Sequence, residues 1–144
     1  MKRHALIIGI DSYDEHEIVN LDYASNDAAR LAEVLKEGLH FDRVRLMQCQ
    51  GDQDMQPTGP KILHQLNWLQ QNLQPDDLFV FFFAGHGLQD LLLPKDADPL
   101  SEFTLKQSGL DWQDLMAYFQ HFACRHKALF LDCCRKEPLR DRGA

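Results

Sequence analysis

The middle of the chain contains six consecutive apolar residues, Leu78 to Phe83, and four of them are phenylalanines. A run of this length is typical of a strand, in which successive side chains point to opposite faces. Because both faces of this strand are apolar, both must be covered, as they are in parallel sheets. Three shorter segments favour further strands: Ala5 to Ile10, Val44 to Met47 and Lys127 to Asp132.

Helical patterns separate these strands. The first helix should begin at a cap formed by Ser25 or Asn26 and end at Gly38. Thr58 should cap a second helix, and a third is predicted over Asp111 to Phe122. The side chains expected to face the core are Ala28, Leu31, Val34, Leu35, Ile62, Leu66, Leu69, Leu73, Leu115 and Phe119.

The alternation of strands and helices predicts an α/β fold with a mostly parallel sheet flanked by helices. Residues 88–108 show no clear period, and we expect an irregular region there with one small strand or hairpin at Leu91 to Leu93. We therefore predict one domain over residues 1–135, followed by a charged tail of residues 136–144.

Composition narrows the class of function. The 144 residues carry a formal net charge of −7, which argues against a nucleic-acid partner. No apolar stretch approaches the roughly 20 residues of a membrane-spanning helix, so we expect no membrane partner and a cytoplasmic protein. The four cysteines form no CxxC pair, and free thiols in a reducing compartment are expected.

Two residues suited to nucleophilic catalysis each follow a strand of the predicted sheet. His86 comes just after the run that ends at Phe83, and Cys134 comes just after the last strand. Ligands of parallel sheets bind beyond the carboxyl ends of the strands, so both residues should lie at the same edge. A thiol with a nearby histidine base is the arrangement of cysteine nucleophiles.

Acyl transfer also needs donors for the developing oxyanion. His86 stands between Gly85 and Gly87, whose small size permits a sharp turn and close approach to a substrate. We expect the backbone N–H groups of Gly87 and Cys134 to donate to the oxyanion.

Several motifs in order resemble those of the caspase-like peptidases, in particular their metacaspase-like and bacterial branch. His86 lies 48 positions before Cys134, and the caspase signature Q-A-C-[RQG]-G follows its histidine by about 50 residues. The segments that carry the resemblance are Ala5 to Ile10 with Tyr13, Leu21 with Asn26-Asp27-Ala28, Phe82 to Gly87, Leu93-Pro94 with Asp96, and Leu131 to Cys134.

The resemblance implies a cysteine endopeptidase with the caspase-like α/β/α fold, acting on protein or peptide substrates. We expect no cofactor and no metal, and the calcium requirement of metacaspases is not carried over, because the sequence shows no matching acidic cluster. Cys134 would attack the scissile carbonyl and His86 would protonate the leaving amine. Asp27 and Asp132 match acidic positions that line the pocket for the residue before the cut. Carboxylates there suit Arg or Lys, because a guanidinium pairs with a carboxylate through two hydrogen bonds.

Two departures from the family pattern concern the C-terminal region. Lys136 replaces a small residue, and the strand-helix-strand portion that finishes the family's sheet and pocket does not follow. Three interpretations are open: a fragment, a processed large subunit or an incomplete relative. The partner we expect is a C-terminal small-subunit portion or fused domains. The enzyme could also cut its own chain after one of the basic residues Arg135, Lys136, Arg140 and Arg142.

Three other interpretations were weighed. Cys133 competes with Cys134 as nucleophile, but motif register favours Cys134, and only one of two adjacent side chains should face His86. A zinc site of His86, Cys133 and Cys134 would lack a fourth ligand at tetrahedral geometry. The alternative to an endopeptidase is a non-catalytic caspase-like module that binds a regulatory partner.

Overall fold

Four parallel strands form the centre of the molecule in the computed structural model, which describes residues 1–134 and 138–140 and, of Cys134, only the backbone. They are β1 (Arg3–Gly9), β2 (Arg43–Gln48), β3 (Leu78–Leu88) and β6 (His126–Cys134). β1 pairs with β2 and β3, and β3 pairs with β6, so the order across the sheet is β2-β1-β3-β6. The predicted α/β fold is confirmed.

Two short strands make the sheet mixed. β4 (Leu91–Leu92) runs antiparallel to the end of β3, and β5 (Leu110–Asp111) runs antiparallel to β4. The small strand expected at Leu91 to Leu93 is therefore present. These additions keep the end of β3 paired beyond the point where β1 stops.

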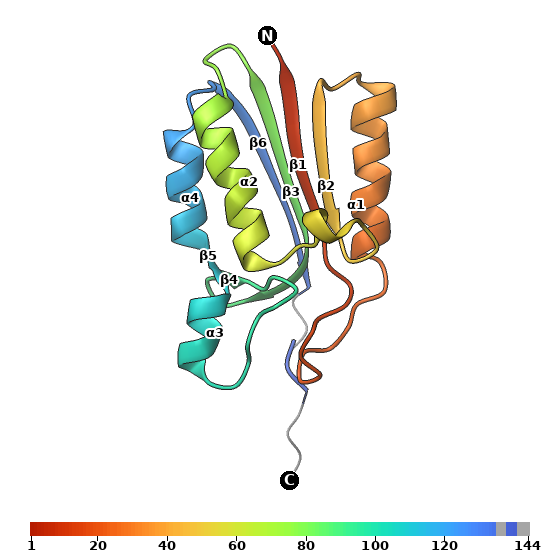
Figure 1. Cartoon of the computed structure of the whole chain (residues 1–144), viewed down its shortest axis with the longest axis vertical. Coiled ribbons are helices and arrows are strands. Elements are labelled where there is room, and N and C mark those ends of the chain that lie inside the picture. Colours follow the sequence, from red (N-terminus) through yellow and green to blue (C-terminus); the bar gives the residue numbers. More distant parts are fainter. Residues whose placement is uncertain (135–137, 141–144) are drawn as a thin grey trace.

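Helices cover both faces of the sheet (Figure 1). On one face lies α1 (Ala24–Glu33), which continues into the π-helical turn η1 (Val34–Gly38). On the other face lie α2 (Gly59–Asn72) and α4 (Trp112–His121). A 3-10 turn, η2 (Gln53–Met55), precedes α2, and α3 (Glu102–Ser108) lies below α4 in the view. No helix in residues 1–134 or 138–140 has the length and apolar character needed to span a membrane.

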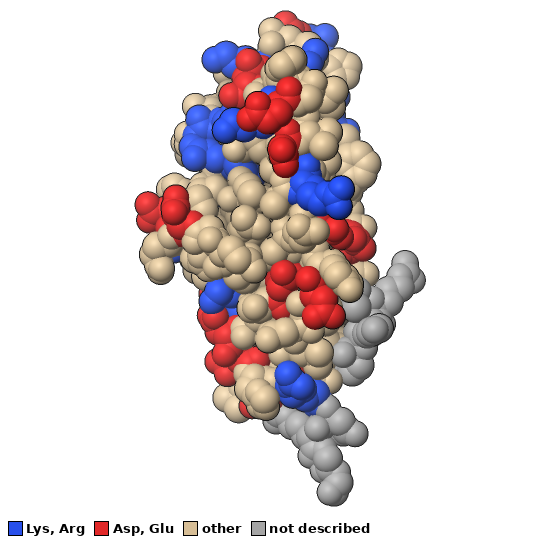
Figure 2. Space-filling view, turned by 90° about the vertical axis from the view of Figure 1, so that its right-hand side faces the viewer, with Lys and Arg blue, Asp and Glu red and all other residues tan. Residues whose placement is uncertain are grey.

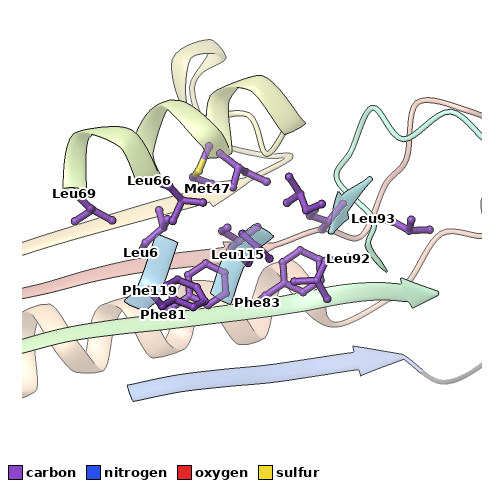
Figure 3. Close-up of a cluster of buried hydrophobic side chains, with 14 of the residues drawn as sticks. Leu6, Met47, Leu66, Leu69, Phe81, Phe83, Leu92, Leu93, Leu115 and Phe119 are labelled. Atoms are coloured by element: carbon purple, nitrogen blue, oxygen red, sulfur yellow. The ribbon is translucent and has the colours of Figure 1, made fainter. Parts of the chain in front are cut away.

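The larger part of the core lies between the sheet and the α2 and α4 helices. Phe81 and Phe83 of β3 pack there with Leu66 of α2 and Phe119 of α4 (Figure 3). The Phe81 and Phe119 rings have centroids 5.1 Å apart, a spacing typical of tilted aromatic pairs. The opposite face has a smaller apolar cluster, in which Ala28 of α1 packs against the sheet.

The start of α1 differs from the prediction. Its N-cap is Tyr23, which makes no side-chain capping bond, and neither Ser25 nor Asn26 caps it. Instead, the Asp11 carboxylate accepts the Ser25 N–H at 3.0 Å from the loop after β1. The predicted inward position of Val34 is also wrong, since this side chain is 55% exposed where α1 changes into a π-helical turn.

Two further boundaries differ from those expected. The region of residues 88–108 contains α3, which a capping box at its start stabilises: Ser101 Oγ accepts the Thr104 N–H, and Thr104 Oγ1 accepts the Ser101 N–H. β3 does not stop before His86 but continues through it to Leu88, because β4 and β6 both pair with this extension.

Gly9 is required where α1 crosses the end of β1. A Cβ at Gly9 would lie 2.5 Å from the Ala24 carbonyl oxygen and 2.6 Å from the Ala28 Cβ. We expect Gly9→Ala to lower the free energy of unfolding by about 3 kcal/mol through overpacking. Gly38→Ala is the matched control, because its nearest neighbour would be a Val34 methyl at 4.0 Å. Denaturant titration should show no loss for the control, and equal losses would contradict this role of Gly9.

Candidate active site

His86 and Cys134 lie opposite each other on the neighbouring strands β3 and β6. They form the last pair in the register between β3 and β6. Neighbouring strands lie about 4.8 Å apart, so the backbones of the two residues are adjacent. The two residues lie within the strands, not beyond their ends as expected, because both strands extend further than their apolar runs. The Cys134 side chain, on which the predicted nucleophile depends, lies outside the described atoms.

The His86 imidazole is buried, with 1% of the residue exposed. Its Nε2 lies 2.6 Å from the backbone carbonyl oxygen of Val19. Because a carbonyl only accepts, Nε2 carries a proton, and the neutral ring has its lone pair on Nδ1. Nδ1 is buried and has no hydrogen-bond partner among the described residues. Nδ1 is therefore a proton acceptor that no described residue occupies.

Burial lowers the pKa of His86 below its ordinary value of 6.5, since the imidazolium loses hydration; the hydrogen bond to Val19 opposes the shift. We expect an NMR titration of the imidazole to have its midpoint below pH 6.5. In the unfolded chain His86 takes up its proton at higher pH, so its contribution to stability is complete above about pH 6.5 and is lost as the pH falls towards the folded-state pKa. A midpoint at or above 6.5 would contradict the assignment.

The loop between β1 and α1 holds His86 from two sides. It supplies the Val19 carbonyl, and it also supplies Tyr13, whose hydroxyl accepts the His86 backbone N–H at 2.8 Å. The Tyr13 and His86 rings have centroids 5.2 Å apart. The contact through Val19 gives no sequence signal, because any residue has a carbonyl. Tyr13 stands in a family-like motif, but its role as a partner of His86 was not predicted.

One cavity of about 580 Å³ is lined by three of the predicted site residues. Its lining includes His86, Asp27 of α1 and Asp132 of β6. Asp22, which the sequence analysis missed, also lines it. The three carboxylate side chains are exposed to solvent. Among the described residues, a neutral imidazole therefore borders a cavity whose charged lining side chains are acidic.

Cys133 of β6 and Gly87 of β3 pack against each other. A Cβ at Gly87 would lie 3.2 Å from the Cys133 Cβ and 3.3 Å from its Sγ, so the glycine leaves room for the thiol. Cys133 is half-buried against the core cluster on the α2 and α4 side. Asp132 lines the cavity on the other face, as alternation along a strand requires. The oxyanion role of Gly87 stays a prediction, and so does the choice of Cys134 over Cys133 as nucleophile.

The segment after β6 returns to the loop that holds His86. Val19 donates its N–H to the Pro138 carbonyl at 2.8 Å, next to the carbonyl it presents to His86. Leu139 forms a β-bridge with Ile18, and Arg140 Nε donates to the His16 carbonyl. Of the predicted tail, residues 135–137 and 141–144 lie outside the described part of the chain.

Metal-binding groups and surface charge are the remaining features of this region. The described residues contain no group of three or more His, Cys, Asp or Glu side chains placed to hold a metal ion. The charges on the face that carries α1 are mixed, with acidic and basic side chains interspersed (Figure 2).

Comparison with protein families identifies the family of this chain. The family model Peptidase C14, described as the caspase domain, matches residues 2–144. The chain belongs to the caspase-domain family. The match covers nearly all of the sequence, including both β3 and β6, so the family resemblance of the individual motifs is confirmed for the domain as a whole.

Curated relatives of this caspase domain are metacaspases. Metacaspase-1 of Pyricularia oryzae is 34% identical over 100 residues, which are 67% of this chain and 25% of the relative. Metacaspase-1A of Aspergillus niger is 32% identical over 100 residues, or 67% of this chain and 24% of the relative. The chain thus matches about a quarter of the length of these proteins.

Solved structures share the fold. Protein GSU0716 from Geobacter sulfurreducens aligns with a TM-score of 0.71 at 19% identity, covering 93% of this chain and 51% of that one. The structure of pro-sf-caspase-1 aligns with a TM-score of 0.59 at 18% identity, covering 97% of this chain and 54% of the other. The caspase domain described here therefore corresponds to about half of each solved chain.

Proposed function

We propose that this caspase domain is the catalytic portion of a cysteine endopeptidase that cleaves after Arg or Lys, with His86 and Cys134 as its dyad. The observation that carries the proposal is the buried His86 ring, which has its Nε2 bonded to Val19 and its Nδ1 unpaired among the described residues, directly across from Cys134 in the strand register. Membership of a peptidase family supports the same chemistry.

The proposed reaction proceeds by acyl transfer through a thioester. The Cys134 thiol gives its proton to His86 Nδ1, and the thiolate attacks the scissile carbonyl carbon. The N–H groups of Gly87 and Cys134 donate to the resulting oxyanion. His86 Nδ1–H then protonates the leaving amine as the C–N bond breaks, and water, deprotonated by the same nitrogen, hydrolyses the thioester to release the acid and the free thiol.

The acidic side chains that line the cavity support the proposed preference for a basic residue before the cut. Asp27 and Asp132 line the same cavity as His86, and no lysine or arginine of the described residues lines it with them. A guanidinium bound there would gain charge-assisted hydrogen bonds, which are worth roughly 1.5–3 kcal/mol each. An acidic residue before the cut would instead meet charge repulsion.

An apolar part of the sheet that no described helix covers supports the binding of a polypeptide partner. Beside α1, the sheet carries an apolar groove of about 640 Å³ whose lining includes Leu35, Phe82 and Phe130, and Phe130 is 54% exposed. We propose that the portion corresponding to the unmatched half of the two solved caspase-fold chains packs here and pairs with the edge of β6 that no described strand occupies. Such packing would cover the apolar side chains of the groove and pair the edge of the sheet.

The decisive assay is hydrolysis of fluorogenic peptides with Arg, Lys or Asp before the cut. We expect cleavage after Arg and Lys by the wild-type protein and none by Cys134→Ala, with Cys133→Ala as the matched control. Unchanged cleavage by Cys134→Ala would contradict the dyad.

A second candidate function is a non-catalytic interaction module, which the exposed apolar groove favours. The same assay separates the two functions. Absence of hydrolysis of every peptide, together with a stable complex of higher solution mass, would favour the module over the peptidase.

Self-cleavage in the basic C-terminal segment is a related proposal. Arg135, Lys136 and Arg142 lie outside the described residues, whereas the exposed Arg140 donates its backbone N–H to the Glu17 carbonyl. We expect incubation of the wild type to release fragments that end at one of these basic residues, and Cys134→Ala to stay intact. Intact-mass spectra that remain identical for the two proteins would contradict self-cleavage.

A further inference from the structure

We infer that Tyr13 is a positioning residue of the proposed dyad: its hydroxyl holds the backbone of His86 and its ring restricts the imidazole. This inference rests on the proposed peptidase function. It assigns a role to a side chain that lies outside the dyad and the acidic cavity described above.

The hydroxyl of Tyr13 takes the place of a missing strand residue. The register of β1 with β3 ends at Gly9 and Ala84, and one more bond follows, from the Ile10 N–H to the Ala84 carbonyl. In a regular parallel ladder the next N–H on that side, that of His86, would donate to a carbonyl of the neighbouring strand. The chain has already left the sheet, and Tyr13 Oη accepts this N–H at 2.8 Å.

The ring of Tyr13 makes a second contact with His86. The two ring centroids are 5.2 Å apart with an interplanar angle of 41°. With Nε2 bonded to Val19 and one side of the imidazole against Tyr13, rotation about the side-chain bonds of His86 is limited. Both contacts come from one loop, so the backbone and the ring of His86 are held by a single element.

Tyr13 is itself fixed. Only 8% of the residue is exposed, and its own N–H donates to Asn20 Oδ1 at 3.1 Å. Burial raises the pKa of the Tyr13 phenol above its usual range, so the hydroxyl stays neutral at working pH.

Gly85 makes room for this hydroxyl, since a Cβ at Gly85 would lie 3.1 Å from it. The glycine before His86 thus has a physical role that its place in the motif does not reveal. Any side chain at position 85 would press on the Tyr13 hydroxyl and, at 3.2 Å, on the Phe83 ring.

Tyr13→Phe tests the inference, because it removes one oxygen and keeps the ring. We expect the His86 backbone amide to exchange with solvent at least about 10-fold faster, and kcat to fall about 10- to 100-fold with KM within about twofold, since small displacements of a catalytic group have effects of this size. Tyr118→Phe is the matched control. It also removes a hydroxyl with a hydrogen bond, to Asn67 Oδ1 at 2.8 Å, but on the exposed surface of α4.

Gly85→Ala is the second variant, and it should show the same faster exchange at His86. Unchanged His86 exchange in Tyr13→Phe, or an unchanged kcat, would overturn the positioning role. The exchange measurement needs no activity. A wild-type protein that cleaves no peptide would therefore refute the proposed function, while the exchange rate of the His86 amide would still decide whether Tyr13 holds that residue.

Discussion

His86→Ala is expected to lower kcat/KM for Arg peptides at least about 1000-fold, while the protein remains folded. The substitution removes the only group to which the proposal assigns proton transfer, both from the thiol and to the leaving amine. Loss of one member of a catalytic dyad costs about as much activity as loss of both members. The measurement is steady-state hydrolysis with thermal unfolding of the same samples.

His64→Ala provides the control for loss of an imidazole, because His64 is exposed on α2. It should leave kcat/KM within about twofold of the wild type. If His86→Ala retained more than about a tenth of the wild-type activity, another base would have to act and the dyad would be wrong.

The double substitution Asp27→Asn and Asp132→Asn is expected to remove the preference for Arg. Without the carboxylates, kcat/KM for Arg peptides should fall about 10- to 100-fold relative to matched Gln peptides, since replacing a charge-assisted hydrogen bond by a neutral one costs about 1 kcal/mol at each of the two positions. The comparison of Arg with Gln substrates isolates the cavity from general damage to the catalytic residues.

The double substitution Glu33→Gln and Glu37→Gln is the control for the change in net charge, because both side chains are exposed, Glu33 at the far end of the same helix as Asp27 and Glu37 in η1. It should keep the wild-type ratio of Arg to Gln cleavage. An unchanged ratio in the double aspartate variant would show that the acidic cavity does not select the residue before the cut.

The fold followed from apolar patterns, and its misjudged boundaries have physical reasons. The apolar runs 5–10 and 78–83 identified two central strands, because strands buried on both faces have few alternatives. The extension of β3 through His86 was missed, since Gly85 and Gly87 suggested a turn while pairing with β4 and β6 keeps the segment extended. Tertiary pairing outweighed local preference there.

The candidate site was predictable only where side chains carry the chemistry. Asp27, His86 and Asp132 were identified from their residue types and motif positions, and the structure places all three at one cavity. The backbone carbonyl of Val19 could not be identified in this way, because its contribution does not depend on its side chain. The contact of Tyr13 with His86 depends on how the loop after β1 folds back over β3, which no spacing in the sequence specifies.

Covalent trapping with an arginyl peptide chloromethyl ketone tests the account most directly, because the reagent needs both the nucleophile and the acidic cavity. We predict a single adduct that fragment-ion mass spectrometry assigns to Cys134, present in Cys133→Ala and absent in Cys134→Ala and His86→Ala. An adduct on Cys133, or equal labelling by an aspartyl reagent, would contradict a Cys134 nucleophile served by an acidic cavity.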